Sequence, residues 1–265
     1  MRKYSFFVCF ISVIFVFVVN GNAEESIDFS FVVVSDFHAV GETDIERFKT
    51  FVKQLKELTP EPELVVITGD ISAQNFEKAF RELNPVIPFH VIFGNIEKRN
   101  DRKILANMFP QDFAENDFYS FNYKNAKFIM LCTAPDNGDH IGHFESGGIK
   151  GEEQQAWLEE QLKEAKTNKL LSFVFSHIPP SPDGKAGKLF ISSNDQKALR
   201  DLFHIYKPTA MFCGHLHRKW EFSIEHVPVF IVPSLSWNLE SQTIGFYQVK
   251  VKGSELHTKF VPLEF

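Results

Sequence analysis

The sequence has few cysteines and no dense cluster of basic residues, and both features exclude classes of protein. With three cysteines in 265 residues, one of them in the N-terminal apolar segment, it cannot build a disulfide-stabilised scaffold. Cys132 and Cys213 lie in apolar stretches typical of internal strands, where either a disulfide or two buried thiols would fit. The formal net charge of -6, without a Lys/Arg cluster, argues against a nucleic-acid-binding face.

The apolar run near the N-terminus is too short to be read as a membrane span. It extends from Phe6 to Val19, after Met1-Arg2-Lys3 and before the small and polar residues 20–23. This order is typical of a secretory signal peptide, and about fourteen apolar residues fall short of the roughly 20 that a spanning helix needs. We therefore predict a signal peptide over residues 1–23, a domain over 24–265 and a secreted or periplasmic location. An uncleaved anchor, which would be the expected membrane contact, is the alternative.

The chain also lacks linkers, repeats and low-complexity segments, which predicts a single domain. Strands and helices alternate through most of it, and this alternation is typical of a parallel sheet with helical crossovers. The expected strands are 29–35, 64–67, 89–93, 118–123, 127–132, 170–175 and 210–213, followed by four or five antiparallel strands after residue 220. The expected helices begin at about 44, with Thr43 and Glu46 as a capping box, and then cover 76–83, 98–109, 152–165 and a segment from the cap Asn194 to Tyr206.

Polar side chains follow five of these strands at the point where each strand ends. Ligands of open α/β sheets bind outside the carboxyl ends of the strands, so we expect these side chains to meet. They are Asp36, His38, Asp70, Asn95, His177, His215 and His217. Each has an ordinary explanation when taken alone, such as a helix cap for Asp70 or a turn residue for Asn95. Seven such residues at five strand ends together favour one shared site.

The stretch Gly214-His215-Leu216-His217 is the most informative of these strand ends. A glycine lets the backbone turn sharply. If the loop then leaves in an extended conformation, side chains two residues apart point the same way. We therefore expect both imidazoles to reach one site.

The seven side chains offer nitrogen and oxygen ligands and no thiolate, a set that suits Zn, Fe, Mn or similar divalent ions. Seven are too many for one tetrahedral ion but fit two ions that share a bridging carboxylate. Two such ions can clamp the attacking and leaving oxygens of a phosphoryl displacement, and they generate a hydroxide nucleophile near neutral pH. The sequence thus predicts a two-metal site for phosphoester hydrolysis.

The order of these motifs, Asp-x-His, Gly-Asp, Gly-Asn-x-Glu, His and Gly-His-x-His, resembles the calcineurin-like metallophosphoesterase superfamily, from about Phe29 to the end of the chain. The resemblance implies a four-layer α/β/β/α sandwich with the two-metal site at the strand ends. By motif position it places the first metal on Asp36, His38 and His217, and the second on Asn95, His177 and His215. Asp70 would bridge the two ions.

One position departs from the family pattern. The third motif usually continues with a histidine that contacts the phosphate and protonates the leaving oxygen, whereas this chain has Ile96. Some branches of the family lack this histidine and resemble phosphodiesterases. We therefore expect a secreted phosphodiester hydrolase that uses a metal-activated hydroxide. His140 and His143, in a glycine-rich loop, are candidate substrate contacts, although loop histidines are often simply solvated. A metal-bearing but catalytically weak binding protein is the alternative.

Overall fold

The computed structural model describes residues 28–145, 149–185 and 187–265. The predicted signal peptide lies outside these residues. Within the described ranges, no helix has both the length and the apolar character needed to cross a membrane.

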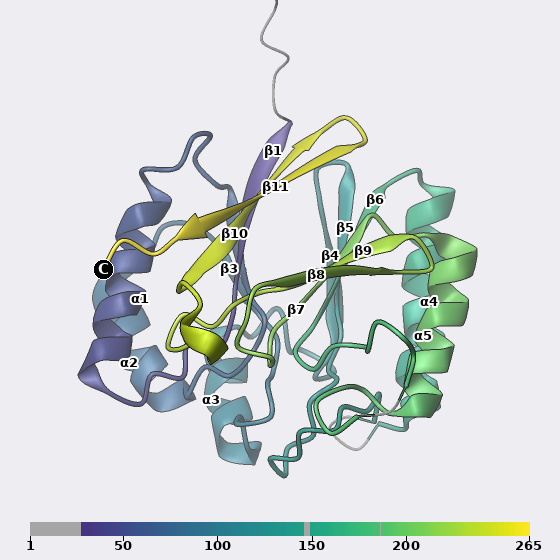
Figure 1. Cartoon of the computed structure of the whole chain (residues 1–265), viewed down its shortest axis with the longest axis horizontal. Helices are drawn as coiled ribbons and strands as arrows, with labels where there is room; N and C mark the ends of the chain where they lie inside the picture. Colours follow the sequence, from purple (N-terminus) through teal and green to yellow (C-terminus); the bar gives the residue numbers. More distant parts are fainter. Residues whose placement is uncertain (1–27, 146–148, 186) are drawn as a thin grey trace, which may run out of the picture.

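Two sheets stand face to face at the centre of the molecule (Figure 1). The first has the strand order β11-β10-β1-β2-β3 and the second the order β4-β5-β6-β7-β9-β8. Strands β1, β2 and β3 are parallel to one another, as are β5, β6, β7 and β9. The parallel strands of each sheet therefore send their carboxyl ends to a common edge.

The elements follow one another as the sequence predicts, with small shifts at their ends. The strands are β1 (Phe29–Val34), β2 (Leu64–Ile67), β3 (Phe89–Val91), β4 (Tyr119–Tyr123), β5 (Ala126–Met130), β6 (Leu171–Ser176), β7 (Ala210–Cys213), β8 (Trp220–Ile224), β9 (Val227–Ile231), β10 (Gly245–Lys252) and β11 (Glu255–Pro262). The helices are α1 (Glu42–Leu55), α2 (Ala73–Leu83), α3 (Arg99–Met108), α4 (Gly151–Thr167), α5 (Ser193–Tyr206) and the short 3-10 turn η1 (Leu239–Ser241).

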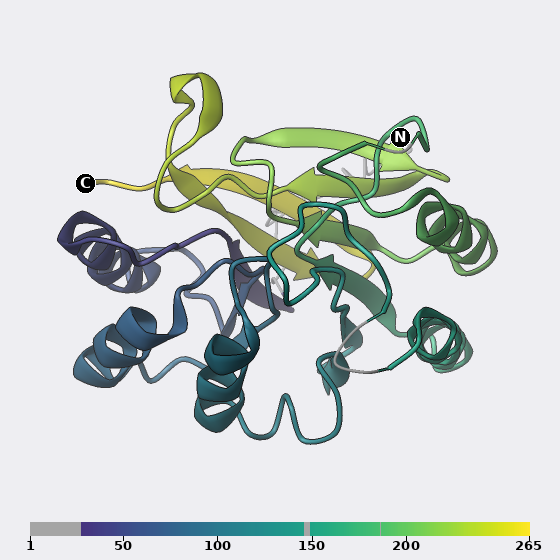
Figure 2. The same ribbon diagram turned by 90° about the horizontal axis from the view of Figure 1, so that it is seen from below.

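Three apolar layers hold the sandwich together, and strand β1 shows why its sequence is apolar throughout. Phe31 and Val33 face the second sheet and pack in the layer between the two sheets. Val32 and Val34 point the other way, toward α1 and α2, because successive strand side chains alternate in direction. Helices α4 and α5 cover the outer face of the second sheet in the same manner (Figures 1 and 2). The predicted four-layer α/β/β/α sandwich is confirmed.

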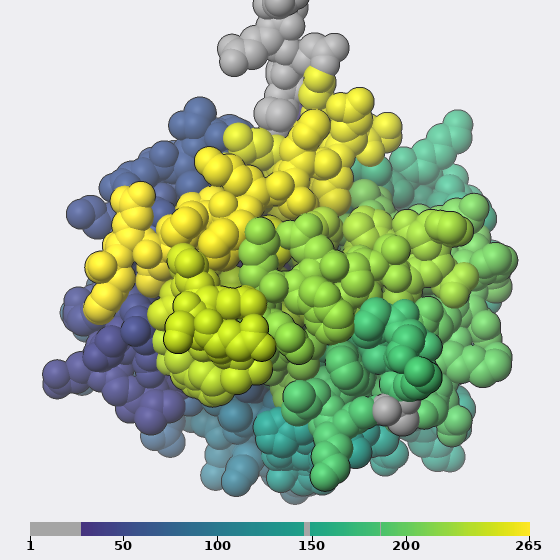
Figure 3. All heavy atoms as spheres, in the orientation of Figure 1, coloured from purple at the N-terminus to yellow at the C-terminus, as the bar shows by residue number. Residues whose placement is uncertain are grey.

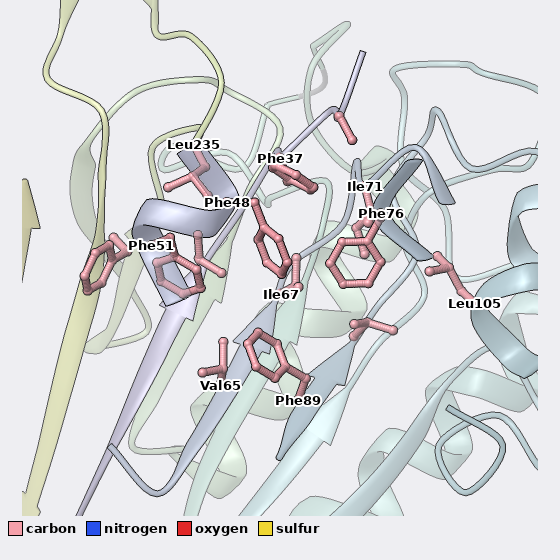
Figure 4. Close-up of a cluster of buried hydrophobic side chains, with 14 of the residues drawn as sticks. Phe37, Phe48, Phe51, Val65, Ile67, Ile71, Phe76, Phe89, Leu105 and Leu235 are labelled. Carbon is pink, nitrogen blue, oxygen red and sulfur yellow. The ribbon is translucent and has the colours of Figure 1, made fainter. Parts of the chain in front are cut away.

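Aromatic residues in the outer layer connect the first motif to the helices. Phe37, which lies between Asp36 and His38, is fully buried and its ring centroid lies 4.7 Å from that of Phe48 in α1. Phe76 of α2 completes the cluster (Figure 4). The central residue of Asp-x-His thus fixes its loop to the helical layer.

Two predicted helix caps and one prediction for the C-terminal region are wrong. Helix α1 begins at Glu42 with Gly41 as its cap, and Asp44 rather than Glu46 accepts the backbone N–H groups of Val40 and Gly41. Helix α5 is capped by Ser192, whose hydroxyl accepts the Asp195 N–H at 3.3 Å, instead of Asn194. The region after residue 220 contains the short turn η1 beside its four strands, and β9 pairs with β7 in parallel.

The two remaining cysteines are both buried, and no disulfide joins them. The Cys132 sulfur accepts a hydrogen bond from Arg102, while the Cys213 sulfur lies 3.3 Å from the Ser176 hydroxyl. The structure therefore selects two buried thiols over the disulfide.

Candidate metal centre

All seven predicted residues follow strands at the edge where the parallel strands of both sheets end. This edge is at the bottom of Figure 1. The first sheet supplies Asp36, His38, Asp70 and Asn95 from the loops after β1, β2 and β3. The second supplies His177, His215 and His217 from the ends of β6 and β7. The site therefore spans the two sheets, and it forms only when they pack against each other.

The loops that carry these side chains have an unusual backbone. Asp36, His38, Asp70, His215 and His217 have φ values of 51°, 55°, 56°, 72° and 46°. Residues other than glycine rarely adopt this left-handed backbone conformation. It costs on the order of 1–3 kcal/mol per residue and is often found at functional sites. The rest of the fold must stabilise these loops, because their local conformation is unfavourable.

Asp36, His38 and His217 form one half of the centre. The Nε2 atoms of His38 and His217 lie 3.0 Å apart, and His217 Nε2 lies 3.2 Å from Asp36 Oδ1. With Asp70, these residues place one ligand atom each within 4.8 Å of one another. Two imidazole nitrogens and two carboxylates that converge in this way have the composition of a divalent metal site.

Asn95, His177 and His215 form the other half, next to Asp70. His177 Nε2 lies 3.0 Å from the Asn95 side-chain oxygen and 3.2 Å from Asp70 Oδ1. The ring centroid of His215 is 5.1 Å from that of His177. Asp70 thus lies between the two halves, as expected for a carboxylate shared by two ions.

The expectation of an extended Gly-His-x-His loop is wrong. Both histidines have a positive φ, and the ring of His215 lies beside His177 whereas that of His217 lies beside His38. The two imidazoles therefore serve different halves of one centre. Gly214 is also not at a positive φ; a side chain there would collide with Ser35 and Asp36, so this position needs the small residue for space rather than for a turn.

Backbone carbonyls orient two of the histidines. His177 Nδ1 lies 2.7 Å from the Thr68 carbonyl, and His217 Nδ1 lies 3.0 Å from the Trp237 carbonyl. A carbonyl accepts only from N–H, so each contact places the proton on Nδ1 and leaves Nε2 facing the centre. Metal-binding histidines commonly use their second nitrogen in this way.

Glu97 is a structural residue of the centre to which the sequence analysis gave no role. It is fully buried, and its carboxylate accepts the backbone N–H groups of Gly94 at 2.5 Å, Asp70 at 3.0 Å and Ile71 at 2.6 Å. It therefore ties the second motif to the third. Its place in Gly-Asn-x-Glu was the available signal. A carboxylate three residues after a glycine can accept the backbone N–H of that glycine, and such charge-assisted hydrogen bonds are strong.

The electrostatics of the centre favour added positive charge. Burial would raise the pKa of the Asp36 and Asp70 carboxyl groups, but the nearby histidines hold both pKa values below the usual range. Burial lowers the pKa of His177, but the charge of Asp70 and its hydrogen bond outweigh that effect and raise it to about 9. Burial and the charge of His177 lower the pKa of His215 to about 3. Two buried carboxylates thus draw cationic partners to themselves.

Two buried atoms of the centre support the same conclusion. Asp36 Oδ1 and His215 Nε2 make no hydrogen bond of good geometry, although both are buried. Buried polar atoms are nearly always paired with a protein group, water or an ion. The two atoms lie in opposite halves of the centre, so the residues fit one ion in each half.

The two loop histidines have different surroundings. His140 is exposed, and its ring centroid lies 5.2 Å from that of His215. His143 lies 3.7 Å from an Asp195 oxygen and lines a cavity of about 900 Å³ that also contacts Phe93 and Arg102. None of the seven side chains of the centre lines this cavity. His140 is therefore the one placed beside the centre.

Comparison with known structures shows a shared fold. The described structure superposes on a dimetal phosphatase from Danio rerio with a TM-score of 0.69 at 15% identity, over 89% of this chain and 97% of the other. A purple acid phosphatase from yellow lupin (Lupinus luteus) seeds gives 0.60 at 14% identity, over 88% and 51%. GAP50, the anchor in the inner membrane complex of Plasmodium, gives 0.63 at 18% identity, over 90% and 86%. No curated protein matches the chain by sequence.

The sequence profile of the calcineurin-like phosphoesterase family matches residues 29–219. This range contains all seven side chains of the centre, and the cluster in the structure agrees with it. The centre is therefore a site for two divalent metal ions. The chain belongs to the calcineurin-like phosphoesterase family.

Proposed function

We propose that this phosphoesterase hydrolyses phosphodiesters in preference to phosphomonoesters. The observation that supports this preference is Ile96, which occupies the third-motif position next to Asn95. When bound, two divalent ions in such a site polarise the phosphoryl group and supply a hydroxide nucleophile near neutral pH. The residues of the centre would hold these ions, and the side chains around them would determine which leaving groups can depart.

Ile96 contributes its backbone but no proton. Its N–H donates to Asp70 Oδ1 at 3.1 Å, which orients the carboxylate between the two halves of the centre. Its half-buried side chain cannot protonate a departing oxygen, which gains negative charge as the P–O bond breaks. Esters with stabilised leaving groups therefore suit the site better than alkyl monoesters.

The test is hydrolysis of bis(p-nitrophenyl) phosphate by the purified protein with Mn²⁺, compared with p-nitrophenyl phosphate. We expect the diester to be cleaved with the higher kcat/KM. We also expect EDTA to abolish the activity and added Mn²⁺ to restore it. A higher kcat/KM for the monoester would contradict the proposed preference, and activity that survives complete metal removal would contradict the mechanism.

A metal-bearing but catalytically weak binding protein is the second candidate. Ile96 favours it, as does the shared fold with a Plasmodium protein described as an anchor. The same assay separates the two functions. Two tightly bound ions by elemental analysis, without hydrolysis of either ester, would favour the binding protein. Retention of all seven side chains is the reason to prefer the enzyme.

We also propose that the protein is secreted through its N-terminal segment. The charged start, the apolar run from Phe6 to Val19 and the small residues up to Ala23 form a signal peptide pattern. The natively expressed protein is expected to begin near Glu24 and to be found outside the cytoplasm. N-terminal sequencing that returned an intact Met1 would contradict this prediction.

A further inference from the structure

An exposed tryptophan flanks the open side of the metal centre. Six of the seven side chains of the centre are buried, and His38 is the exception. The Trp237 ring lies nearly parallel to that of His38, at 22° and 6.5 Å between centroids, and 4.1 Å from that of His217. Yet 53% of Trp237 is exposed. A molecule that reaches the centre past His38 therefore passes this indole.

The loop that carries Trp237 is firmly held. The Ser234 hydroxyl accepts the backbone N–H of Trp237 at 3.1 Å and donates to the Asp36 carbonyl at 2.8 Å. Beyond Trp237, the Leu239 N–H donates to the His217 carbonyl at 2.8 Å. Both ends of the loop are thus fixed to residues of the first half of the centre, so the backbone that carries the indole is held in place.

The segments that carry His38 and Trp237 each hold one further exposed apolar residue. Leu239 is 44% exposed and Val40, two residues after His38, is 76% exposed. Asp44 connects the two segments, because it accepts both the Val40 N–H and the Ser236 hydroxyl. The segment around η1 stands out from the body of the protein in yellow-green (Figures 2 and 3). We call Val40, Trp237 and Leu239 the apolar shelf.

We propose that the apolar shelf binds a planar aromatic substituent of the phosphodiester substrate, with the Trp237 indole as the stacking surface. This inference rests on the proposed function, since the phosphate must lie on the metal centre for its substituent to reach the shelf. An exposed indole on a fixed backbone, with one neighbour in the His217 ring, offers an aromatic ring an offset-stacked partner at low entropic cost. Stacking of a base on an aromatic side chain is worth about 1–3 kcal/mol, or roughly 5- to 150-fold in affinity at 1.4 kcal/mol per tenfold.

The test measures binding of three non-chromogenic diesters to the Mn²⁺-loaded protein by titration calorimetry. Diphenyl phosphate is planar and aromatic, dibutyl phosphate is apolar without a ring, and dimethyl phosphate is small. Trp237→Ala is expected to lower the affinity for diphenyl phosphate about tenfold and to change the affinity for dimethyl phosphate by less than about twofold. Trp237→Phe should retain most of the affinity for diphenyl phosphate. Val86→Ser, at a position that is 98% exposed between α2 and β3, is the control and should change nothing.

Three outcomes would overturn the proposal. If Trp237→Ala lowered the affinities for diphenyl and dibutyl phosphate equally, the contact would be a general apolar one in place of stacking. Equal weakening of diphenyl and dimethyl phosphate, with loss of Mn²⁺ by elemental analysis, would assign Trp237 to the support of His217. Unchanged affinity for all three would leave the shelf without a ligand role. Hydrolysis of the diesters is measured separately. Selective binding of diphenyl phosphate without hydrolysis would overturn the proposed function but support the role of the shelf. Hydrolysis without selective binding would support the proposed function but overturn the role of the shelf.

Discussion

Replacing Asp70 with asparagine is expected to weaken the binding of both metal ions and to lower turnover more than about 100-fold. Loss of outer partners of a metal site already costs about 10- to 100-fold in metal affinity or activity, and Asp70 would be a direct ligand. Its ligand atom clusters with those of Asp36, His38 and His217, and its Oδ1 also lies 3.2 Å from His177 Nε2. One substitution therefore removes charge from both halves. Elemental analysis of protein purified without chelator measures the effect.

The asparagine variant is a clean test because it should keep the local structure. Asp70 has a φ of 56°, and asparagine tolerates this left-handed conformation as well as aspartate does. The side-chain oxygen of asparagine can also still accept the Ile96 N–H. The loss would therefore report the missing charge and not a rearranged loop.

Asn95→Ala provides the matched control. Asn95 contacts His177 and lies outside the cluster of Asp36, His38, Asp70 and His217. This variant should keep one ion and lose the other. Two tightly bound ions in Asp70→Asn would contradict the role of Asp70 as the shared ligand, and loss of both ions in Asn95→Ala would contradict the division into halves.

The position of the centre could be predicted from the sequence because it depends on a general property of parallel sheets. Asp36, Asp70 and Asn95 follow successive parallel strands, and His177 and His215 follow two more. Carboxyl ends of parallel strands share an edge, so the order of strands and helices was sufficient to bring each set together. The motif order then indicated that the two sets belong to one centre.

The local geometry could not be predicted, because it depends on contacts between distant segments. The loop of His215 and His217 adopts left-handed φ values that its own sequence disfavours, and it does so against Ser35 and Asp36 of the other sheet. Nothing in the sequence around Trp237 indicates that the Trp237 backbone carbonyl contacts His217. Helix caps failed for a related reason: Asp44 serves Val40 and Ser236 together, and the second contact is 192 residues away in the sequence.

Replacing Ile96 with histidine is expected to change which leaving groups the enzyme can expel. An aryl oxide tolerates the negative charge that develops on the departing oxygen, whereas an alkoxide needs a proton. A positioned general acid typically contributes about 10²–10⁴-fold. Ile96→His should therefore raise kcat/KM for alkyl leaving groups by about this range and for aryl leaving groups by much less. The measurement is the dependence of kcat/KM on leaving-group pKa in a series of methyl phosphodiesters.

The structure suggests a control variant for Ile96→His and another side chain that could act as the general acid. Ile96→Leu keeps an apolar side chain and the backbone N–H that holds Asp70, so it should leave the slope unchanged. His140, whose ring lies 5.2 Å from that of His215, is the candidate to supply a proton in place of the missing histidine. If the natural protein already shows a shallow slope that Ile96→His leaves unaltered, and His140→Ala makes it steep, then His140 protonates the leaving oxygen. In that case the absence of an acid at residue 96 does not restrict the substrate.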